Sequence, residues 1–189
     1  HSATKYLNGH SDIVAGCVVG ASDRIDAVLH KLNHLGGCLD PHACFLLHRG
    51  IKTLPLRVGY QNQSASSLAS FLDAHPGVER VVYPGLEHHP DHSRAIQLFR
   101  GFGGMISFCA HRDVAAADRV VSALELPACE PSLGGVESLV TRPATTTHSG
   151  MTPEERSAMG IEDRLIRVSV GIESTDDLCA DFDRAREKP

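Results

Sequence analysis

The sequence predicts an α/β protein, because segments with helical periodicity alternate along the chain with short β-branched segments. The chain has 189 residues, of which 42% are apolar and 22% are charged, so we expect one or two globular domains. The predicted strands are residues 12–19, 78–83, 104–110, 136–141 and 164–172. The predicted helices are residues 22–35, 41–49, 56–75, 91–99, 113–124, 152–159 and 175–187.

Residues that start or stop helices set several of these boundaries. Ser22 or Asp23 is expected to cap the first helix, which stops before the glycine pair at 36–37. Asp40-Pro41 is typical of an N-cap followed by proline at the first helical position. Thr152 begins a Thr-Pro-Glu-Glu sequence, which combines a capping hydroxyl with early acidic residues.

Composition and charge exclude several functions. No apolar run approaches the ~20 residues of a membrane span. The net charge is -5, which does not favour a nucleic-acid surface. We therefore expect neither a membrane nor a nucleic acid as partner. The chain begins at His1 rather than Met and shows no signal segment, so we expect it to be part of something longer.

The six cysteines form no CxxC pair, so neither a zinc ribbon nor thioredoxin chemistry is indicated. Most lie in apolar runs and are expected to be small buried side chains rather than disulfide partners. This expectation favours a reducing, cytoplasmic environment. The cysteines are at positions 17, 38, 44, 109, 129 and 179.

The first twelve residues carry the clearest chemistry. Ser2 and Thr4 flank Lys5, shortly before the predicted strand at 12–19. A lysine amine can form a Schiff base with an aldehyde, and hydroxyls can donate to a phosphate. This combination suits pyridoxal phosphate (PLP), although a surface lysine in a polar loop would have the same local sequence.

The chain resembles the trans-sulfuration (Cys/Met metabolism) family of PLP-dependent enzymes, most closely cystathionine γ-synthase and γ-lyase. The resemblance covers essentially the whole chain but only the C-terminal half or so of a family member. It rests on six segments: SATKYLNGHSD (2–12), RGIKTLPLRV (49–58), VVYPGLEHHPDH (81–92), GFGGMISF (101–108), PSLGGVESLVTRPATTTH (131–148) and GIEDRLIRVSVGIES (160–174).

The resemblance implies a fold and a domain division. Residues 1–56 would be the tail of the PLP-binding large domain, of fold type I and similar to aspartate aminotransferase. Residues 57–189 would form the C-terminal α/β small domain, with a mainly antiparallel sheet. The family also implies a homotetramer built as a dimer of dimers, and a plastid location if a transit segment precedes the chain.

The resemblance also implies residue roles. Lys5 would be the Schiff-base and proton-transfer lysine, Ser2 and Thr4 would bind the cofactor phosphate, and Arg167 and Ser132 would seat the substrate carboxylate. Asp12 would not be the partner of the PLP ring nitrogen, because that residue lies upstream in the family.

Independently of the resemblance, the predicted strand at 164–172 alternates Leu165, Arg167 and Ser169 against three aliphatic residues. An arginine on such a strand needs an anionic partner, which is either a ligand carboxylate or a structural carboxylate nearby.

The resemblance determines the class of reaction better than the particular reaction. Many γ-synthases and γ-lyases carry glutamate at the position of Pro131, so this residue departs from the common pattern of both. Cystathionine γ-synthase is favoured, because PSLGG at 131–135 resembles plant-type and some bacterial synthases and LRVGYQN at 56–62 points the same way. Cystathionine or methionine γ-lyase and homoserine-ester sulfhydrylase are the alternatives. A further alternative is a catalytically incomplete fragment with a role in assembly.

Three further sets of residues receive other interpretations. His88, His89 and His92 are expected to form a joint between a loop and a helix rather than a metal site. His148 resembles a position near the family's active-site entrance, although a structural role suits it equally. Arg49, Lys52 and Arg57 are expected on a solvated or interface face, without catalytic function.

Overall fold

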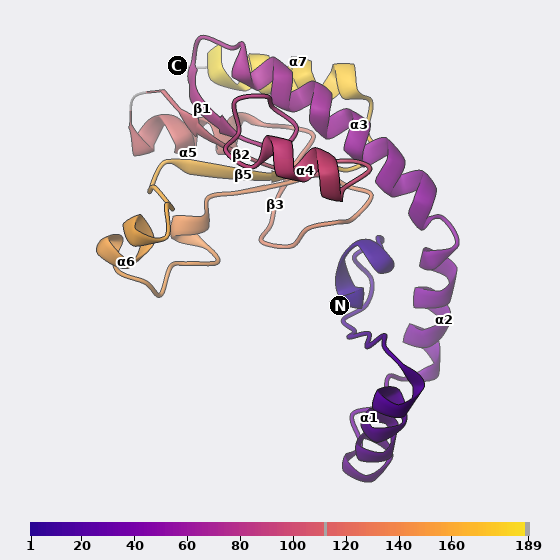
Figure 1. Cartoon of the computed structure of the whole chain (residues 1–189). Coiled ribbons are helices and arrows are strands. Elements are labelled where there is room, and N and C mark those ends of the chain that lie inside the picture. Colours follow the sequence, from indigo (N-terminus) through magenta and orange to yellow (C-terminus); the bar gives the residue numbers. More distant parts are fainter. Residues whose placement is uncertain (112, 188–189) are drawn as a thin grey trace. The chain divides into compact units, whose positions relative to one another are not determined.

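The structure is a computed structural model that describes residues 1–111 and 113–187 (Figure 1). The chain divides into two compact units, His1–Pro55 and Leu56–Pro189. The predicted assignment of residues 1–56 to a cofactor domain and 57–189 to a small domain stays a prediction. None of the helices in the described ranges is long and apolar enough to cross a membrane.

The first unit contains the short π-helical turn η1 (Ala3–Leu7) and the helices α1 (Ser22–Leu35) and α2 (Pro41–Ile51). The predicted strand at 12–19 is wrong: this segment makes only one isolated antiparallel bridge, between Ser2 and Gly16. A strand needs a partner along its length, and here the backbone hydrogen bonds from His1, Ala3 and Thr4 reach only Ala15 and Cys17. Val14 and Val19 are consequently 86% and 79% exposed.

Helix α1 has the predicted span, but its N-cap is Ala21, without a side-chain hydrogen bond, rather than Ser22 or Asp23. None of its residues is buried. Its end at Gly36 is as predicted, because Gly36 has a φ of 80°, which glycine adopts without strain.

Helix α2 starts as predicted at Asp40-Pro41. The Asp40 carboxylate accepts hydrogen bonds from the N–H groups of His42 and Ala43, both at 3.0 Å. Near its other end, Gly50 lies directly against the loop that follows Lys5. A Cβ atom placed on Gly50 would lie 2.2 Å from the carbonyl oxygen of Asn8.

Replacing Gly50 with alanine is therefore expected to destabilise the first unit. Overpacking of this kind costs about 1–3 kcal/mol, more than the ~1 kcal/mol that alanine contributes in a helix. Gly59→Ala in α3 is the matched control, since a Cβ there meets nothing within 4 Å. Urea unfolding should show opposite signs for the two variants, and equal effects would contradict the steric explanation.

The second unit is a five-stranded sheet covered by helices. Its strands are β1 (Val78–Val82), β2 (Met105–Ala110), β3 (Ala128–Cys129), β4 (Leu139–Thr141) and β5 (Leu165–Ser169). Their order is β1-β2-β5-β4-β3, and only the β3–β4 pair is parallel. The predicted mainly antiparallel sheet is confirmed. β3 was not predicted, because two residues are too few to show periodicity.

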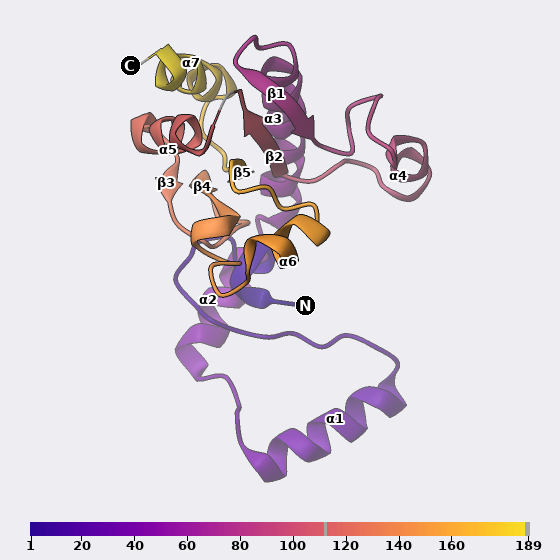
Figure 2. The same ribbon diagram turned by 90° about the vertical axis from the view of Figure 1, so that its left-hand side faces the viewer.

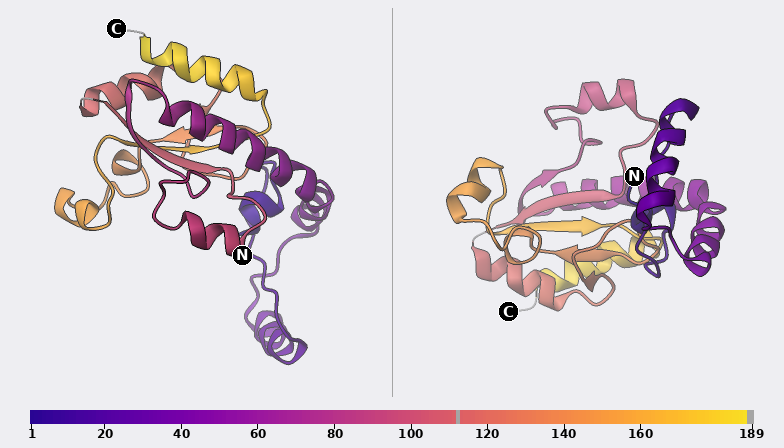
Figure 3. Two further views of the ribbon diagram at one scale, coloured as in Figure 1. Left: turned by 45° about the horizontal axis from the view of Figure 1, so that its top comes forward. Right: turned by 90° about the horizontal axis from the view of Figure 1, so that it is seen from below.

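Three helices cover one face of this sheet: α3 (Leu54–Asp73), α5 (Val114–Ala123) and α7 (Thr175–Glu187) (Figures 1 and 3). α5 and α7 lie side by side (Figure 2). Apolar residues at the even-numbered positions of β5 and at the position just after it point into this core: Ile166, Val168 and Val170 are each 0% exposed. The predicted alternation in β5 is confirmed, so Arg167 and Ser169 lie on the face opposite the helices.

The remaining elements are short. α4 (His92–Leu98), the 3₁₀ turn η2 (Pro143–Thr145) and α6 (Pro153–Ala158) lie in connections between strands. α6 has the predicted start, with a complete capping box between Thr152 and Glu155.

Two expectations about burial need correction. Of the six cysteines, only Cys109 is buried, whereas Cys38, Cys44 and Cys129 are exposed. Apolar neighbours in sequence did not bury them, because Cys38 lies in a loop and Cys44 and Cys129 lie on exposed sides of α2 and β3. Arg57 is 5% exposed rather than solvated, which lowers the pKa of its guanidinium.

Candidate active site

The predicted site residues fall into two groups, one in each compact unit. Ser2, Thr4 and Lys5 belong to the first unit, and Ser132 and Arg167 belong to the second. Each group has its own local geometry.

Lys5 lies inside η1, where the backbone departs from helical geometry with φ -91° and ψ -131°. Two backbone hydrogen bonds close the turn around it: Asn8 N to Ala3 O at 3.1 Å and Gly9 N to Lys5 O at 2.8 Å. The Asn8 side chain donates to Asp12 Oδ1 at 2.7 Å and holds the following loop. Lys5 is half-buried, so its amine is carried on a well-connected turn rather than on a free surface loop.

The two hydroxyls beside Lys5 have different surroundings. Thr4 Oγ1 accepts from Ala15 N at 2.9 Å and donates to Ala15 O at 3.3 Å. The second bond is longer than the usual range for O–H donors, so the Thr4 proton can turn to a better acceptor. Ser2 is exposed, and its hydroxyl bonds to no side chain or backbone group in the part of the chain that the structure describes.

These residues fit PLP in their chemistry. The Lys5 amine is of the type that forms a Schiff base with an aldehyde, and the neighbouring hydroxyls of Ser2 and Thr4 are of the type that donate to a phosphate. Asp12 accepts a hydrogen bond from the Asn8 side chain, and its exclusion as a ring-nitrogen partner stays a prediction.

Arg167 lies in the middle of β5, and its guanidinium reaches the loop at 131–138. Nη2 donates to the carbonyl oxygens of Pro131 at 2.7 Å and Ser132 at 3.1 Å. Burial lowers the pKa of this guanidinium. Within residues 1–111 and 113–187, Arg167 has no carboxylate partner, and its Nε and Nη1 groups make no hydrogen bond.

The described residues place no carboxylate beside Arg167, so the structural ion pair is not formed within them. A half-buried guanidinium held only by carbonyl oxygens lacks the anion that best compensates its lost hydration. The geometry therefore suits an anionic ligand, and a carboxylate matches the guanidinium shape best.

Ser132 is half-buried, and its carbonyl oxygen faces Arg167. The structure thus brings the two predicted substrate residues into contact. Pro131 contributes a second carbonyl and places no acidic side chain beside the guanidinium.

Three residues that hold the 131–138 loop were not predicted from the sequence. Ser169 Oγ accepts from Gly134 N at 2.9 Å, and Gln61 Nε2 donates to Gly135 O at 2.7 Å. The Glu173 carboxylate accepts from both the backbone and the hydroxyl of Ser138. Two signals could have revealed them: Ser169 shares the strand face of Arg167, and Gln61 occupies the apolar stripe of α3 that continues through Ala65 and Leu68.

The histidines take structural positions. His92 Nδ1 lies 2.8 Å from Pro84 O, and His89 Nδ1 accepts from Asp91 N at 3.1 Å. His148 is half-buried and contacts the Thr147 hydroxyl at 2.8 Å. The described residues contain no group of three or more side chains arranged to hold a metal ion.

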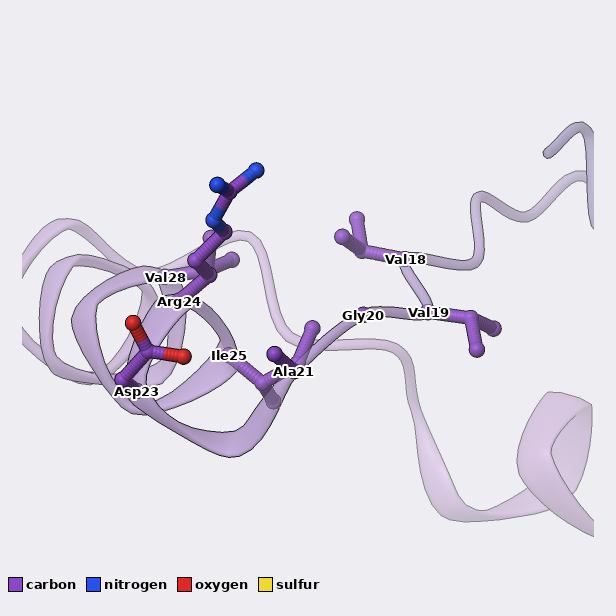
Figure 4. Close-up of a pocket in the computed structure, with 8 residues that line it drawn as sticks. All are labelled: Val18, Val19, Gly20, Ala21, Asp23, Arg24, Ile25 and Val28. Atoms are coloured by element: carbon purple, nitrogen blue, oxygen red, sulfur yellow. The ribbon is translucent and has the colours of Figure 1, made fainter.

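A hollow at the start of α1 contains none of the predicted site residues (Figure 4). Its only charged lining residues are Asp23 and Arg24, which lie next to each other in sequence. The other lining residues are small or aliphatic: Val18, Val19, Gly20, Ala21, Ile25 and Val28.

The fold has a solved counterpart, the cystathionine gamma synthase of Xanthomonas oryzae pv. oryzae in complex with aminoacrylate and cysteine. The TM-score is 0.93 at 42% identity, over 100% of this chain and 50% of that one. This likeness confirms the predicted fold type I of PLP-dependent enzymes.

The chain belongs to the Cys/Met metabolism PLP-dependent enzyme family, whose sequence pattern matches residues 1–187. It is 43% identical over 187 residues to cystathionine gamma-synthase 1, chloroplastic, of Arabidopsis thaliana, covering 99% of this chain and 33% of that protein. It is 48% identical over 191 residues to cystathionine gamma-lyase of Bacillus subtilis, covering 99% and 49%. The chain thus spans a third to a half of the length of these relatives.

Proposed function

We propose that this chain is the lysine- and arginine-bearing part of a PLP-dependent trans-sulfuration enzyme that acts at Cγ of homoserine-derived amino acids. The observation that carries the proposal is the Arg167 guanidinium, held by two carbonyl oxygens with no carboxylate partner among the described residues. In a chain of this family, an amino-acid carboxylate is the natural ligand for such a group.

PLP, when bound, supplies an electron sink for the electrons left when the substrate loses its Cα proton. Lys5 would hold the cofactor through its amine, and Ser2 and Thr4 would donate to its phosphate. Once released by the substrate, the Lys5 amine would remove the Cα proton and move protons at Cβ. Arg167 and the Ser132 backbone would orient the substrate through its carboxylate.

Within this class we favour γ-replacement, the reaction of a cystathionine γ-synthase, in which cysteine displaces the leaving group of an activated homoserine ester. Pro131 supports this choice, because the PSLGG sequence at 131–135 resembles that of plant-type synthases. The γ-lyase reaction has equal support from the relatives, since the Bacillus subtilis protein is a cystathionine gamma-lyase.

A pair of assays separates the two reactions. The purified protein is given either O-succinylhomoserine and cysteine, or cystathionine alone. We expect cystathionine to form in the first assay with a higher kcat/KM than the release of ammonia and a 2-oxo acid in the second. A higher kcat/KM for cystathionine breakdown would instead assign the γ-lyase reaction.

Intact mass and visible absorbance of the isolated protein should be measured first. A mass near 20.3 kDa without cofactor absorbance would contradict catalysis and favour the incomplete fragment with a role in assembly. The homotetramer and the cytoplasmic or plastid location belong to the same proposal, and the mass of the native assembly tests the former.

A further inference from the structure

β5 and the residues that follow it contact the 131–138 loop at every second residue, through two side chains and one backbone N–H. Arg167 donates to the carbonyls of Pro131 and Ser132, and Ser169 accepts from the N–H of Gly134. The N–H of Gly171 then donates to Ser138 Oγ at 2.8 Å. Because side chains at i and i+2 share a strand face, Arg167 and Ser169 contact neighbouring parts of one loop.

The middle one of these contacts is buried. Ser169 is 1% exposed, and Gly134 is buried with a φ of 81°, a conformation that glycine adopts readily. On the next residue, Gln61 holds the carbonyl of Gly135 at 2.7 Å. The glycine pair is therefore held from β5 through its N–H and from α3 through its carbonyl.

Gly134 follows Ser132 by two residues and Pro131 by three, and the carbonyl oxygens of both residues contact Arg167. If Gly134 moved away from β5, the carbonyls of Pro131 and Ser132 would move with it, and the guanidinium would lose its only hydrogen-bond partners in the described chain. A displaced guanidinium must be reordered when a ligand binds, and that reordering weakens binding.

We propose that Ser169 is a positioning residue for Arg167: by holding Gly134, its hydroxyl keeps the Pro131 and Ser132 carbonyls where they orient the guanidinium towards a ligand carboxylate. The inference rests on the proposed function, because it assumes that Arg167 binds the substrate carboxylate. Ser169 itself touches no ligand in this proposal. Replacement of Ser169 should therefore weaken only the binding of ligands that carry a carboxylate.

The test compares two probes on the PLP-loaded protein, glycine and methylamine, which differ by the carboxylate. Dissociation constants come from titration of the visible absorbance. Ser169→Ala should weaken glycine binding about 2- to 10-fold, as expected for one lost hydrogen bond, and leave methylamine binding unchanged. Ser169→Thr, which keeps a hydroxyl, should stay closer to the parent protein.

A second readout does not depend on cofactor or activity. Amide hydrogen exchange of residues 132–135 should become faster in Ser169→Ala, because the buried Gly134 N–H loses its acceptor. Ser64→Ala is the matched control. Ser64 is also 1% exposed and accepts one hydrogen bond, from Thr175 at 3.0 Å. Loss of that hydrogen bond should affect stability without changing the glycine preference, which is the ratio of the dissociation constants for methylamine and glycine.

The outcomes separate this inference from the proposed function. Loss of the glycine preference in Arg167→Lys, together with an unchanged preference in Ser169→Ala, would overturn the positioning role alone. An unchanged preference in Arg167→Lys would overturn the carboxylate assignment itself. Equal weakening of both probes by Ser169→Ala, or the same selective loss in Ser64→Ala, would show only a general structural effect and would also refute the positioning role.

Discussion

Lys5→Ala is expected to abolish covalent attachment of PLP and to lower kcat by at least about 10³-fold. General acid–base catalysis alone contributes about 10²- to 10⁴-fold, and this variant also removes the amine that holds the cofactor. The measurements are the visible absorbance of the protein after addition of PLP and the rate of product formation. Retained activity in Lys5→Ala would refute the assignment of this lysine.

Two further variants sharpen this test. Lys5→Arg keeps the positive charge, but a guanidinium stays protonated and cannot form the linkage, so it should be as inactive as the alanine variant. Lys31→Ala removes an exposed lysine from α1 and should leave both absorbance and activity unchanged. If Lys5→Arg retained most of the activity, charge rather than nucleophilicity would be the function of residue 5.

Arg167→Ala is expected to weaken substrate binding by about 2–5 kcal/mol, or about 30- to 5,000-fold. The large effect follows from the half-buried position of the guanidinium, where water replaces a lost ligand contact poorly. Binding of an amino-acid substrate and kcat/KM are the quantities to measure. Unchanged apparent affinity would remove Arg167 from the site.

The planar shape of the Arg167 guanidinium should matter for substrate binding as well as its charge. Arg167→Lys is expected to recover only part of the affinity, because one ammonium cannot contact two carbonyls and a carboxylate with the geometry of a planar guanidinium. Arg164→Ala is the control, since Arg164 immediately precedes β5 and is paired with Glu79 and Glu162. That variant should change stability but not affinity, and a comparable loss of affinity would mean that charge near β5 acts non-specifically.

Local sequence patterns were informative where local interactions decide the structure. Asp40 caps α2 because its carboxylate reaches N–H groups two and three residues ahead, an interaction within one turn. The predicted alternation of apolar and polar residues around Arg167 is present in β5, because successive side chains of a strand point to opposite faces and only one face of β5 is covered by helices. Patterns failed where a distant partner is needed: residues 12–19 have strand-like composition, yet only Ser2 forms a bridge with them.

The sequence by itself determined the family of this protein and the residue types that the chemistry needs, since the Lys5 and Arg167 segments carry family motifs that survive in the primary structure. Only the tertiary structure decided what surrounds Arg167. Its partners are carbonyl oxygens, which every residue possesses and no sequence pattern marks. The contacts of Ser169 and Gln61 with the glycine pair depend on how β5, α3 and a loop pack together, and such contacts between residues 35 and 74 positions apart arise only from the folded chain.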